Sequence, residues 1–375
     1  MKILVASDKF KGSLTAAEAC AAIAAGLLEG SPDAAHEIRC LPIADGGDGI
    51  ADTLTRAKNG TWIRREVHGP LGKKVTAAYG LLDGGKTAVI EMAAASGLAL
   101  PGETRRDPLR ASTYGTGELL RDAIARGVGE VLLGIGGSAT NDGGSGMALA
   151  LGYRFYDSAG NALTGPPADL DRLARIEPPD TSSFPEVIVA CDVSNPLLGP
   201  RGCTAIYGPQ KGITPETFSL HENRLARLVA ATGERGKAAA DTPGAGAAGG
   251  LGFGAMVFLG ATLVPGFDLV ATRIGLADAV SWADLVVTGE GRLDHQSLEG
   301  KGPGGVVALA RAAGKSTAAF CGSLENRALE ANFGPVVEIG VPQLPLTANL
   351  ARGGEHLRAA ARAFAPTLSP PDRHA

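Results

Sequence analysis

The chain has 375 residues, of which 45% are hydrophobic and 20% charged, and its formal net charge is −4. This length exceeds what one ordinary hydrophobic core accommodates, so we expect two domains. A mildly acidic chain lacks the basic face of a nucleic-acid-binding protein, and that class is disfavoured. Glycine occupies 54 positions, about twice its usual share. Glycine serves where the backbone turns sharply or approaches a ligand closely.

The cysteines and the apolar segments indicate where in the cell the protein is found. Five scattered cysteines without a C-x-x-C pair indicate reduced thiols rather than a disulfide framework or a zinc site. The apolar run that opens the chain is too short for a signal peptide. Segment 247–266 is long enough to cross a bilayer, but it is rich in glycine and has aspartates nearby instead of a basic flank. We therefore expect a cytoplasmic protein with no membrane partner, in which this segment is a buried glycine-rich loop leading into a core helix.

The first elements in chain order follow an α/β pattern. Residues 2–7 form an apolar run that predicts a buried strand, and residues 8–14 form the loop beyond it. Thr15 and Glu18 make a capping box, which starts an alanine-rich helix that fades at residues 26–30. A second strand, a glycine-rich loop and a second helix follow, at 38–43, 44–49 and 50–57. This alternation favours a parallel sheet.

The pattern changes in the middle of the chain and returns near the end. Extended runs joined by short turns predict antiparallel strands, at 61–67, 73–82 and 86–92. Helices near 115–127 and 146–152 then alternate with strands at 130–135 and 186–192. After residue 267, strands at 283–291, 316–322 and 334–340 alternate with helices at 304–314 and 353–365, before a frayed tail. We predict a discontinuous α/β domain from 1–66 and 267–375, with residues 67–266 inserted as a second, mixed-sheet α/β domain.

Five loops lie at the predicted carboxyl ends of strands, where α/β sheets bind ligands, and most of them combine glycine, hydroxyl or amide side chains and aspartate. They are SDKFKGS (7–13), ADGGDG (44–49), GIGGSATNDGG (134–144), CDVSNPLLG (191–199) and TGEGRLDHQ (288–296). Free backbone N–H groups and a helix N-terminus bind anions. Aspartates can hold Mg²⁺ or take a proton from a hydroxyl, and Lys9, Lys11 and Lys211 add positive charge. This combination is typical of phosphoryl transfer, and domain interfaces favour small-molecule clefts.

Other motifs fit less well. LARAAGKST (309–317) ends like a P-loop, but Leu309 replaces the leading glycine and the lysine precedes a predicted strand. GIGGSA (134–139) formally matches a dinucleotide-binding turn, although the next helix is delayed. His295 has no histidine partner in the sequence, so we interpret it as a polar loop residue. An NAD(P)-dependent dehydrogenase of a small hydroxy acid, or a non-catalytic sensor of small acids, remain as alternatives.

Long, unusual motifs give a more specific indication. They run from residue 7 to past residue 300 and include SDKFKGSLTAAEA, PIADGGDGIADTL, LGIGGSATNDGGSGMALALG, CDVSNPLLGPRG, GPQKG, PGAGAAGGLGFG and DLVVTGEGRLDHQSLEGKGPGGV. In this order, they resemble the bacterial glycerate kinase family, of the type that makes 2-phosphoglycerate. The resemblance implies a flavodoxin-like domain built from both chain ends and an inserted mixed-sheet domain, with D-glycerate as acceptor, ATP as donor and Mg²⁺ as cofactor. Two positions depart from the family pattern, Asp48 where glutamate is common and Ser194 where another polar residue is usual.

The resemblance also implies roles for individual residues. Asp45 is the first choice for orienting or deprotonating the glycerate hydroxyl, and Asp192 and Asp294 are candidates for the same role or for binding Mg²⁺. Ser7, Lys9 and Lys11 are expected at the substrate, with Lys9 also near the transferring phosphoryl group. The nucleotide phosphates are expected at Gly136, Gly137, Ser138, Thr140 and Asn141, with Lys211 adding charge nearby. Asn141 and Asp142 are expected to set the shape of this loop or to contact the metal.

Overall fold

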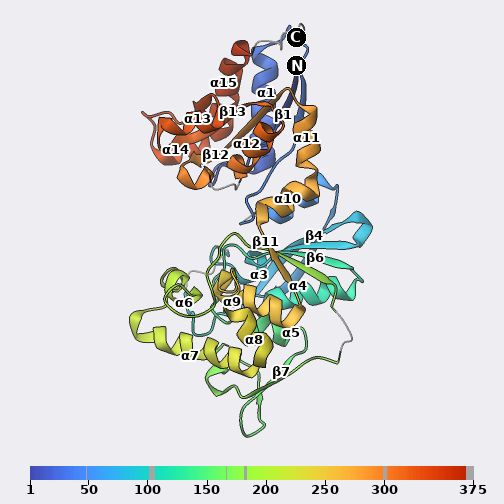
Figure 1. Cartoon of the computed structure of the whole chain (residues 1–375), viewed down its shortest axis with the longest axis vertical. Helices are drawn as coiled ribbons and strands as arrows, with labels where there is room; N and C mark the ends of the chain where they lie inside the picture. The colour runs from blue at the N-terminus through green and yellow to red at the C-terminus, as the bar shows by residue number, and fades with distance from the viewer. Residues whose placement is uncertain (48, 101–105, 166, 181–183, 299–301, 369–375) are drawn as a thin grey trace. The chain divides into compact units, whose positions relative to one another are not determined.

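The computed structural model describes residues 1–47, 49–100, 106–165, 167–180, 184–298 and 302–368 (Figure 1). The chain folds into two compact units, one made of Met1–Asp45 with Phe267–Ala375 and the other of Gly46–Gly266. The predicted boundary between residues 66 and 67 falls inside strand β3 (Thr61–His68), and the predicted boundary between 266 and 267 coincides with a junction of the two units. The tail at 369–375 and Asp48 lie outside the described residues.

The first unit contains a five-stranded, fully parallel sheet. In spatial order its strands are β14 (Val336–Glu338), β13 (Ser316–Leu324), β12 (Leu285–Leu293), β1 (Lys2–Val5) and β2 (Glu37–Cys40). Read from β2, this is the flavodoxin-like order 2-1-3-4-5, with β12 following the inserted unit in the chain. The predicted flavodoxin-like parallel sheet built from both chain ends is therefore confirmed.

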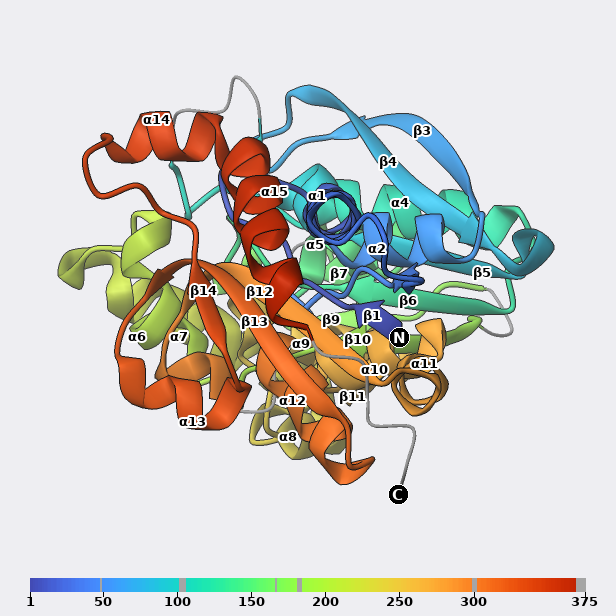
Figure 2. The same cartoon turned by 90° about the horizontal axis from the view of Figure 1, so that it is seen from above.

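Helices cover both faces of this sheet. They are α1 (Ala16–Gly30), α10 (Gly266–Ile274), α11 (Leu276–Trp282), α12 (Gly302–Ala312), α13 (Glu330–Phe333), α14 (Leu346–Ala351) and α15 (Gly353–Phe364). Helices α1 and α15 lie on one side of the sheet and α11 and α12 on the other (Figure 2). Ile3 and Val5 pack with the first pair, whereas Leu4 packs with the second. An unbroken apolar strand is what a sheet buried on both faces requires.

The pairing of α1 with α15 depends on two glycines. The predicted capping box is present, because the Glu18 backbone N–H donates to Thr15 Oγ1 at 3.2 Å and the Thr15 N–H donates to Glu18 Oε2 at 2.9 Å. The helix then runs through Gly26 to Gly30, although glycine has a low helix propensity. A Cβ atom on Gly26 would lie 2.3 Å from the Arg358 carbonyl oxygen of α15. Close helix packing therefore explains both glycines.

The second unit contains a six-stranded mixed sheet, as predicted. Its strands in spatial order are β11 (Thr262–Val264), β10 (Glu186–Ala190), β6 (Glu130–Gly134), β5 (Thr87–Glu91), β4 (Lys74–Leu82) and β3. The first four are parallel, and β3 and β4 pair antiparallel. The last residues of the parallel strands are aligned in register, Glu91 with Gly134, Gly134 with Ala190, and Ala190 with Val264. The loops that follow them leave from one edge.

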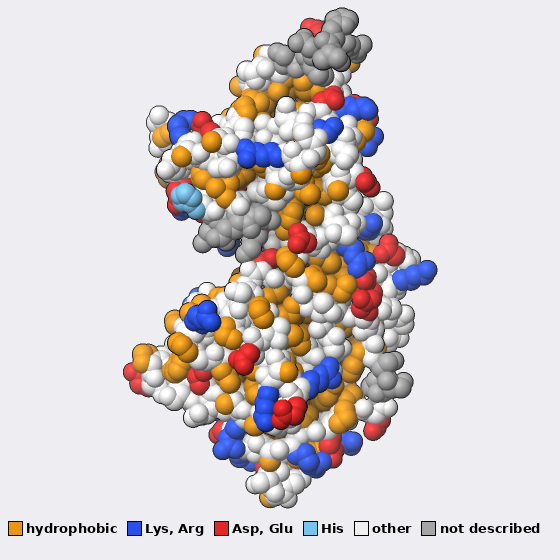
Figure 3. Space-filling model, viewed as in Figure 1, with side chains coloured by type: hydrophobic (Ala, Val, Ile, Leu, Met, Phe, Trp, Pro, Cys, Tyr) orange, Lys and Arg blue, Asp and Glu red, His pale blue; other side chains and the backbone are white. Residues whose placement is uncertain are grey.

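Other elements of the second unit surround this sheet. The helices are α2 (Ile50–Ala57), α3 (Ala93–Ser96), α4 (Tyr114–Ala125), α5 (Ser145–Ala150), α6 (Cys203–Tyr207), α7 (Pro215–Ala231), α8 (Gly233–Ala240) and α9 (Ala247–Gly254). A small antiparallel sheet contains β8 (Ala162–Leu163), β7 (Arg154–Tyr156) and β9 (Arg175–Glu177). The sequence analysis did not identify this small sheet or α6 to α8. On the face shown in Figure 3, acidic and basic side chains are interspersed, in keeping with the small net charge.

The apolar glycine-rich segment after residue 247 is a bent core element. Ala248, Gly249 and Gly250 all have positive φ, at 55°, 68° and 87°, before a helical turn and a π-helical turn at Ala255–Leu259. A Cβ atom on Gly249 would lie 1.9 Å from the Thr140 carbonyl oxygen, so the bend packs directly against the glycine-rich loop after β6. Over the described part of the chain, no helix has the length and apolar character needed to span a membrane.

Candidate active site

The first candidate region lies where β1 and β12 end in the first unit. The Asp8 backbone N–H donates to the Gly289 carbonyl oxygen at 2.9 Å, and so does the Ser7 hydroxyl, at 2.9 Å. Ser7 is fully buried. Its hydroxyl joins the two strands, so the structure places this predicted substrate residue behind the strand ends.

Two carboxyl groups near these strand ends have raised pKa values. Burial and the negative charge of Asp45 raise the pKa of Asp8 to about 7, and Asp8 is only 5% exposed. Burial raises the pKa of Glu290, also to about 7, with contributions from the charges of Asp8, Asp294 and Asp45. Glu290 Oε1 is buried without a hydrogen-bond partner. A carboxyl group that titrates near neutral pH is suited to proton transfer.

We call Asp8, Asp45, Glu290 and Asp294 the carboxyl cluster. Lys9 Nζ lies 3.9 Å from Asp45 Oδ1, and these side chains are 27% and 46% exposed. Asp294 accepts a hydrogen bond from the Ser297 N–H at 3.3 Å through Oδ1. The cluster therefore combines buried and accessible carboxylates, with a lysine beside the most accessible one.

The start of α12 adjoins the cluster. A Cβ atom on Gly302, the first residue of this helix, would lie 3.4 Å from Asp8 Oδ2. The N-terminus of α12 is thus close to Asp8, and the positive end of a helix favours negative charge. Lys11, another predicted substrate residue, is exposed. His295 is also exposed, at 78% of its side chain, as expected of a polar loop residue.

Sequence reasoning missed Asp8 and Glu290. Both belong to loops singled out for their glycine and aspartate, at 7–13 and 288–296. The available signal was an acidic residue next to the apolar core of a strand, after β1 for Asp8 and in the second half of β12 for Glu290. Their importance depends on burial and on facing charges, which come from segments far apart in the chain.

The second candidate region is the glycine-rich loop of the second unit, residues 135–144, between β6 and α5. Gly137 has φ of +69°. The Leu98 N–H donates to the Gly137 carbonyl oxygen and the Ala139 N–H to the Ser96 carbonyl oxygen, both at 2.9 Å. A Cβ atom on Gly136 would lie 2.8 Å from the Gly47 carbonyl carbon. Glycine is required here because neighbouring backbone passes so closely.

Asp142 shapes this loop from within. It is fully buried and accepts hydrogen bonds from the Thr113 N–H and hydroxyl, both at 2.8 Å, from the Gly144 N–H at 3.1 Å and from the Gly146 N–H at 3.2 Å. Burial raises the pKa of Asp142, although these hydrogen bonds oppose the shift. With both oxygens engaged, the carboxylate holds the loop to the start of α4 and α5. Of the two expected roles, loop shape fits this geometry and a metal contact does not.

Lys211 also lies inside the protein. It is 1% exposed, and its Nζ donates to Ser138 Oγ at 2.8 Å and to the Thr140 carbonyl oxygen at 2.7 Å. Asn141 Nδ2 donates to Thr204 Oγ1 at 3.2 Å, and Thr140 Oγ1 is buried without a hydrogen-bond partner. The structure thus brings Ser138, Thr140 and Lys211 together in the interior, where Asn141 of the same loop is also buried.

Asp192 follows β10 in the second unit. Its Oδ1 accepts a hydrogen bond from the Gly266 N–H at 2.8 Å, and a Cβ atom on Gly46 would lie 2.0 Å from its Oδ2. Gly46 and Gly266 are the first and last residues of this unit. Asp294, the other predicted metal ligand, belongs to the first unit. Ser194, the family departure in the same loop as Asp192, is exposed.

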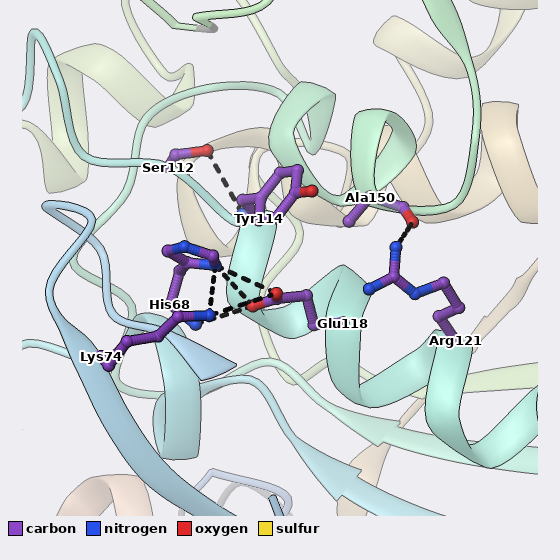
Figure 4. Close-up of polar contacts among 7 residues, drawn as sticks. All are labelled: His68, Lys74, Ser112, Tyr114, Glu118, Arg121 and Ala150. Carbon is purple, nitrogen blue, oxygen red and sulfur yellow. Dashed lines mark hydrogen bonds and ion pairs between the residues drawn. The ribbon is translucent and has the colours of Figure 1, made fainter. Parts of the chain in front are cut away.

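A separate polar cluster joins β3 and β4 to α4 (Figure 4). The His68 N–H donates to Glu118 Oε2 at 2.7 Å, and His68 Nδ1 lies 3.0 Å from both Glu118 oxygens. Lys74 Nζ lies 3.8 Å from Glu118 Oε1, and the Tyr114 ring packs edge-on against the His68 ring at 5.4 Å. Since Glu118 is 12% exposed, we interpret this cluster as a tie between the hairpin and the helix.

The two nucleotide-binding alternatives can be compared with these elements. Lys315 lies between α12 and β13, so the P-loop-like segment ends at a strand and not at a helix start. After GIGGSA, ten residues separate β6 from α5, a longer connection than a dinucleotide-binding turn. Within the described residues, no group of three or more His, Cys, Asp or Glu side chains is arranged to hold a metal ion.

Comparison with known proteins agrees with the sequence resemblance. Residues 3–369 match the family model described as the glycerate kinase family. A glycerate kinase of Bacillus subtilis is 41% identical, covering 98% of each chain, and a glycerate 2-kinase of Escherichia coli is 43% identical, covering 86% of each. A crystal structure from Salmonella typhimurium LT2 that carries the name glycerate kinase 2 has 41% identity, a TM-score of 0.86 and coverage of 98% of each chain. The chain belongs to the glycerate kinase family and is a kinase that phosphorylates glycerate, with ATP as the phosphate donor.

Proposed function

We propose that this protein transfers the γ-phosphoryl group of Mg-ATP to the 2-hydroxyl of D-glycerate, giving 2-phospho-D-glycerate. The observation that carries the chemistry is the carboxyl cluster, in which two buried carboxyl groups titrate near pH 7 beside a more exposed aspartate and a lysine. The Escherichia coli relative, named glycerate 2-kinase, supports the choice of hydroxyl. The cytoplasmic location remains a prediction from the five cysteines, all of them free.

In the proposed mechanism, the first unit prepares the acceptor. Asp45 orients the glycerate hydroxyl and takes its proton, because its side chain, 46% exposed, is more accessible than those of Asp294 and Asp8. Asp8 and Glu290 belong to the same negatively charged cluster. Because their pKa values are near 7, either carboxyl group can hold the proton that leaves the hydroxyl. Lys9, 3.9 Å from Asp45, offsets the charge of the glycerate carboxylate or of the transferring group. Proton removal of this kind contributes about 10²- to 10⁴-fold to a rate.

The second unit binds the nucleotide phosphates in the same proposal. Backbone N–H groups beside glycine bind phosphate oxygens well, and Gly136 and Gly137 lie on the part of the glycine-rich loop that is not fully buried. On the buried side of the loop, the Lys211 side chain holds Ser138 through its hydroxyl and Thr140 through its carbonyl oxygen. The loop therefore presents backbone to phosphate, with its hydroxyl residues as support.

Magnesium is part of the proposal because phosphoryl transfer requires charge neutralisation. Mg²⁺ prefers oxygen ligands and commonly uses one or two carboxylates together with phosphate and water. Asp294 fits this role, since it belongs to the carboxyl cluster, where Glu290 Oε1 is a buried oxygen without a partner. Asp192 fits less well because its Oδ1 binds the Gly266 N–H. When bound, the cation would neutralise negative charge on the phosphates.

The test is to incubate the purified protein with ATP, Mg²⁺ and D-glycerate and to follow the product by phosphorus NMR. We expect a 2-phosphoglycerate signal that depends on all three additions. A 3-phosphoglycerate signal would retain the kinase and refute the assigned hydroxyl. Turnover that persists after removal of divalent cations with EDTA would refute the magnesium requirement.

A further inference from the structure

The lysine behind the glycine-rich loop is an unusual feature of the second unit. Lys211 is among the largest fully buried side chains of the protein. Burying an ammonium group is costly unless its donors are satisfied. The turn that carries it, Pro209–Lys211, ends at Gly212, whose φ of +94° suits glycine. The turn thus holds a charged group inside the protein, directly behind the glycine-rich loop.

The contacts of Lys211 are confined to one part of that loop. Its ammonium donates to Ser138 Oγ at 2.8 Å and to the Thr140 carbonyl oxygen at 2.7 Å, on either side of Ala139. Ala139 is itself fixed by the hydrogen bond from its N–H to the Ser96 carbonyl oxygen. The lysine and the neighbouring backbone therefore fix the same three residues from two directions.

The nearest acid does not offer Lys211 a simple ion pair. Asp142 influences it electrostatically but already accepts four hydrogen bonds from other groups. Burial lowers the pKa of Lys211 to about 8, with Cys203 and Asp142 opposing the shift. A buried cation that is held mainly by uncharged oxygens is poorly explained by stability alone. It is better explained by a requirement for fixed loop geometry.

We propose that Lys211 is a positioning residue that acts on phosphate binding through Ser138 and Thr140, instead of contacting the nucleotide itself. The proposal rests on the proposed function for its catalytic readout. With 1% of its surface exposed, Lys211 reaches a ligand only if the loop moves. Its effect on ATP must therefore pass through the residues that it holds.

The test compares Lys211→Met, Ser138→Ala and the double variant. Hydrogen bonds from a charged donor in a buried site are strong, so their loss is expected to raise the KM for ATP at least about tenfold in Lys211→Met. The KM for glycerate should change less than about twofold. Lys211→Met already removes the hydrogen bond to Ser138 that Ser138→Ala would break, so the double variant should be no worse than Lys211→Met. Lys237→Met is the matched control, since Lys237 is 63% exposed and pairs with Glu234, which is 90% exposed.

Amide hydrogen exchange supplies a readout that does not require catalysis. Exchange at the Ala139 and Leu98 amides, which are hydrogen-bonded at this loop, should be at least about tenfold faster in Lys211→Met than in the wild type. If Lys211→Met does not fold, Ser138→Ala carries the test, with the same amides expected to exchange faster.

Two results would overturn the inference. One is unchanged exchange at these amides in the folded variants. The other is an additive rise in the KM for ATP in the double variant, which would indicate that Lys211 contacts the nucleotide directly. A wild-type protein that does not phosphorylate glycerate would instead refute the proposed function, and the exchange experiment would still decide the role of Lys211.

Discussion

Asp142→Ala tests how much a single buried carboxylate contributes to the second unit. The substitution leaves three backbone N–H groups, those of Thr113, Gly144 and Gly146, without their acceptor in a fully buried site. Each unsatisfied buried donor costs about 1 to 3 kcal/mol. Relief from burying the charge offsets part of this cost, because burial disfavours the ionised form of Asp142. We expect a net loss of about 3 kcal/mol in the free energy of unfolding.

The assay is urea unfolding followed by circular dichroism. With a denaturant slope of about 1 to 3 kcal/mol per molar, this loss lowers the urea midpoint by about 1 M or more. Asp157→Ala is the matched control. Asp157 also accepts three hydrogen bonds, from the Ala159 N–H and from the backbone and side chain of Asn161, but water replaces it at the surface. Its midpoint should stay close to that of the wild type.

The reasoning would be refuted if both variants shifted the midpoint equally. It would also be refuted if Asp142→Ala retained the wild-type midpoint. In either case burial would not decide the contribution of these hydrogen bonds, and the loop would be held in shape by its glycine-rich backbone packing. Hydrogen exchange at the Gly144 and Gly146 amides, measured on the same samples, locates the change within the second unit.

Three further predictions concern the carboxyl cluster and the polar tie. Asp45→Asn should fold normally and lose about 10²- to 10⁴-fold in kcat, and near-normal turnover would remove Asp45 from the mechanism. Because the pKa of Asp8 rises from 3.8 to about 7 on folding, the folded state binds more protons, so stability should fall as pH rises from about 4 to 7. Asp8→Asn should flatten this profile in EDTA-containing buffer, and an unchanged slope would contradict the assignment. Glu118→Ala should cost about 1 to 2 kcal/mol in urea unfolding, since it removes the acceptor of the His68 N–H; an unchanged midpoint would refute the tie.

Local signals were sufficient for much of the fold. The capping box at Thr15 and Glu18 and the helix at Ile50–Ala57 formed as expected. The apolar run at the start of the chain is a strand buried on both faces. Each of these depends on neighbouring residues, through hydrogen bonds within a turn or through side-chain periodicity. The three-stranded sheet of β7, β8 and β9 has strands of only two or three residues, too short for a periodic signal.

The candidate site also has features that depend on neighbouring residues and features that depend on the tertiary structure. Glycine-rich loops were evident from the sequence, which also named Asp45, Asp294 and Lys9 as candidates, together with Asp192. The sequence did not indicate that Asp192 belongs to the other unit. Which carboxyl groups titrate near neutral pH was not evident. The raised pKa of Glu290 comes from burial and from Asp8, Asp45 and Asp294. Asp8 and Asp45 belong to the opposite end of the chain.

The sequence by itself determined the family, the α/β class and the glycine- and aspartate-rich loops that we propose to carry the chemistry, because strand and helix periodicity, caps and glycine motifs are local. Only the tertiary structure decided which polar residues of those loops are internal supports and which are accessible. Ser7, Asp142 and Lys211 are buried, whereas Asp45 is partly exposed. The physical reason is that the solvent exposure and pKa of a side chain depend on which groups the rest of the chain brings within a few ångströms of it. Residue type alone does not determine those groups.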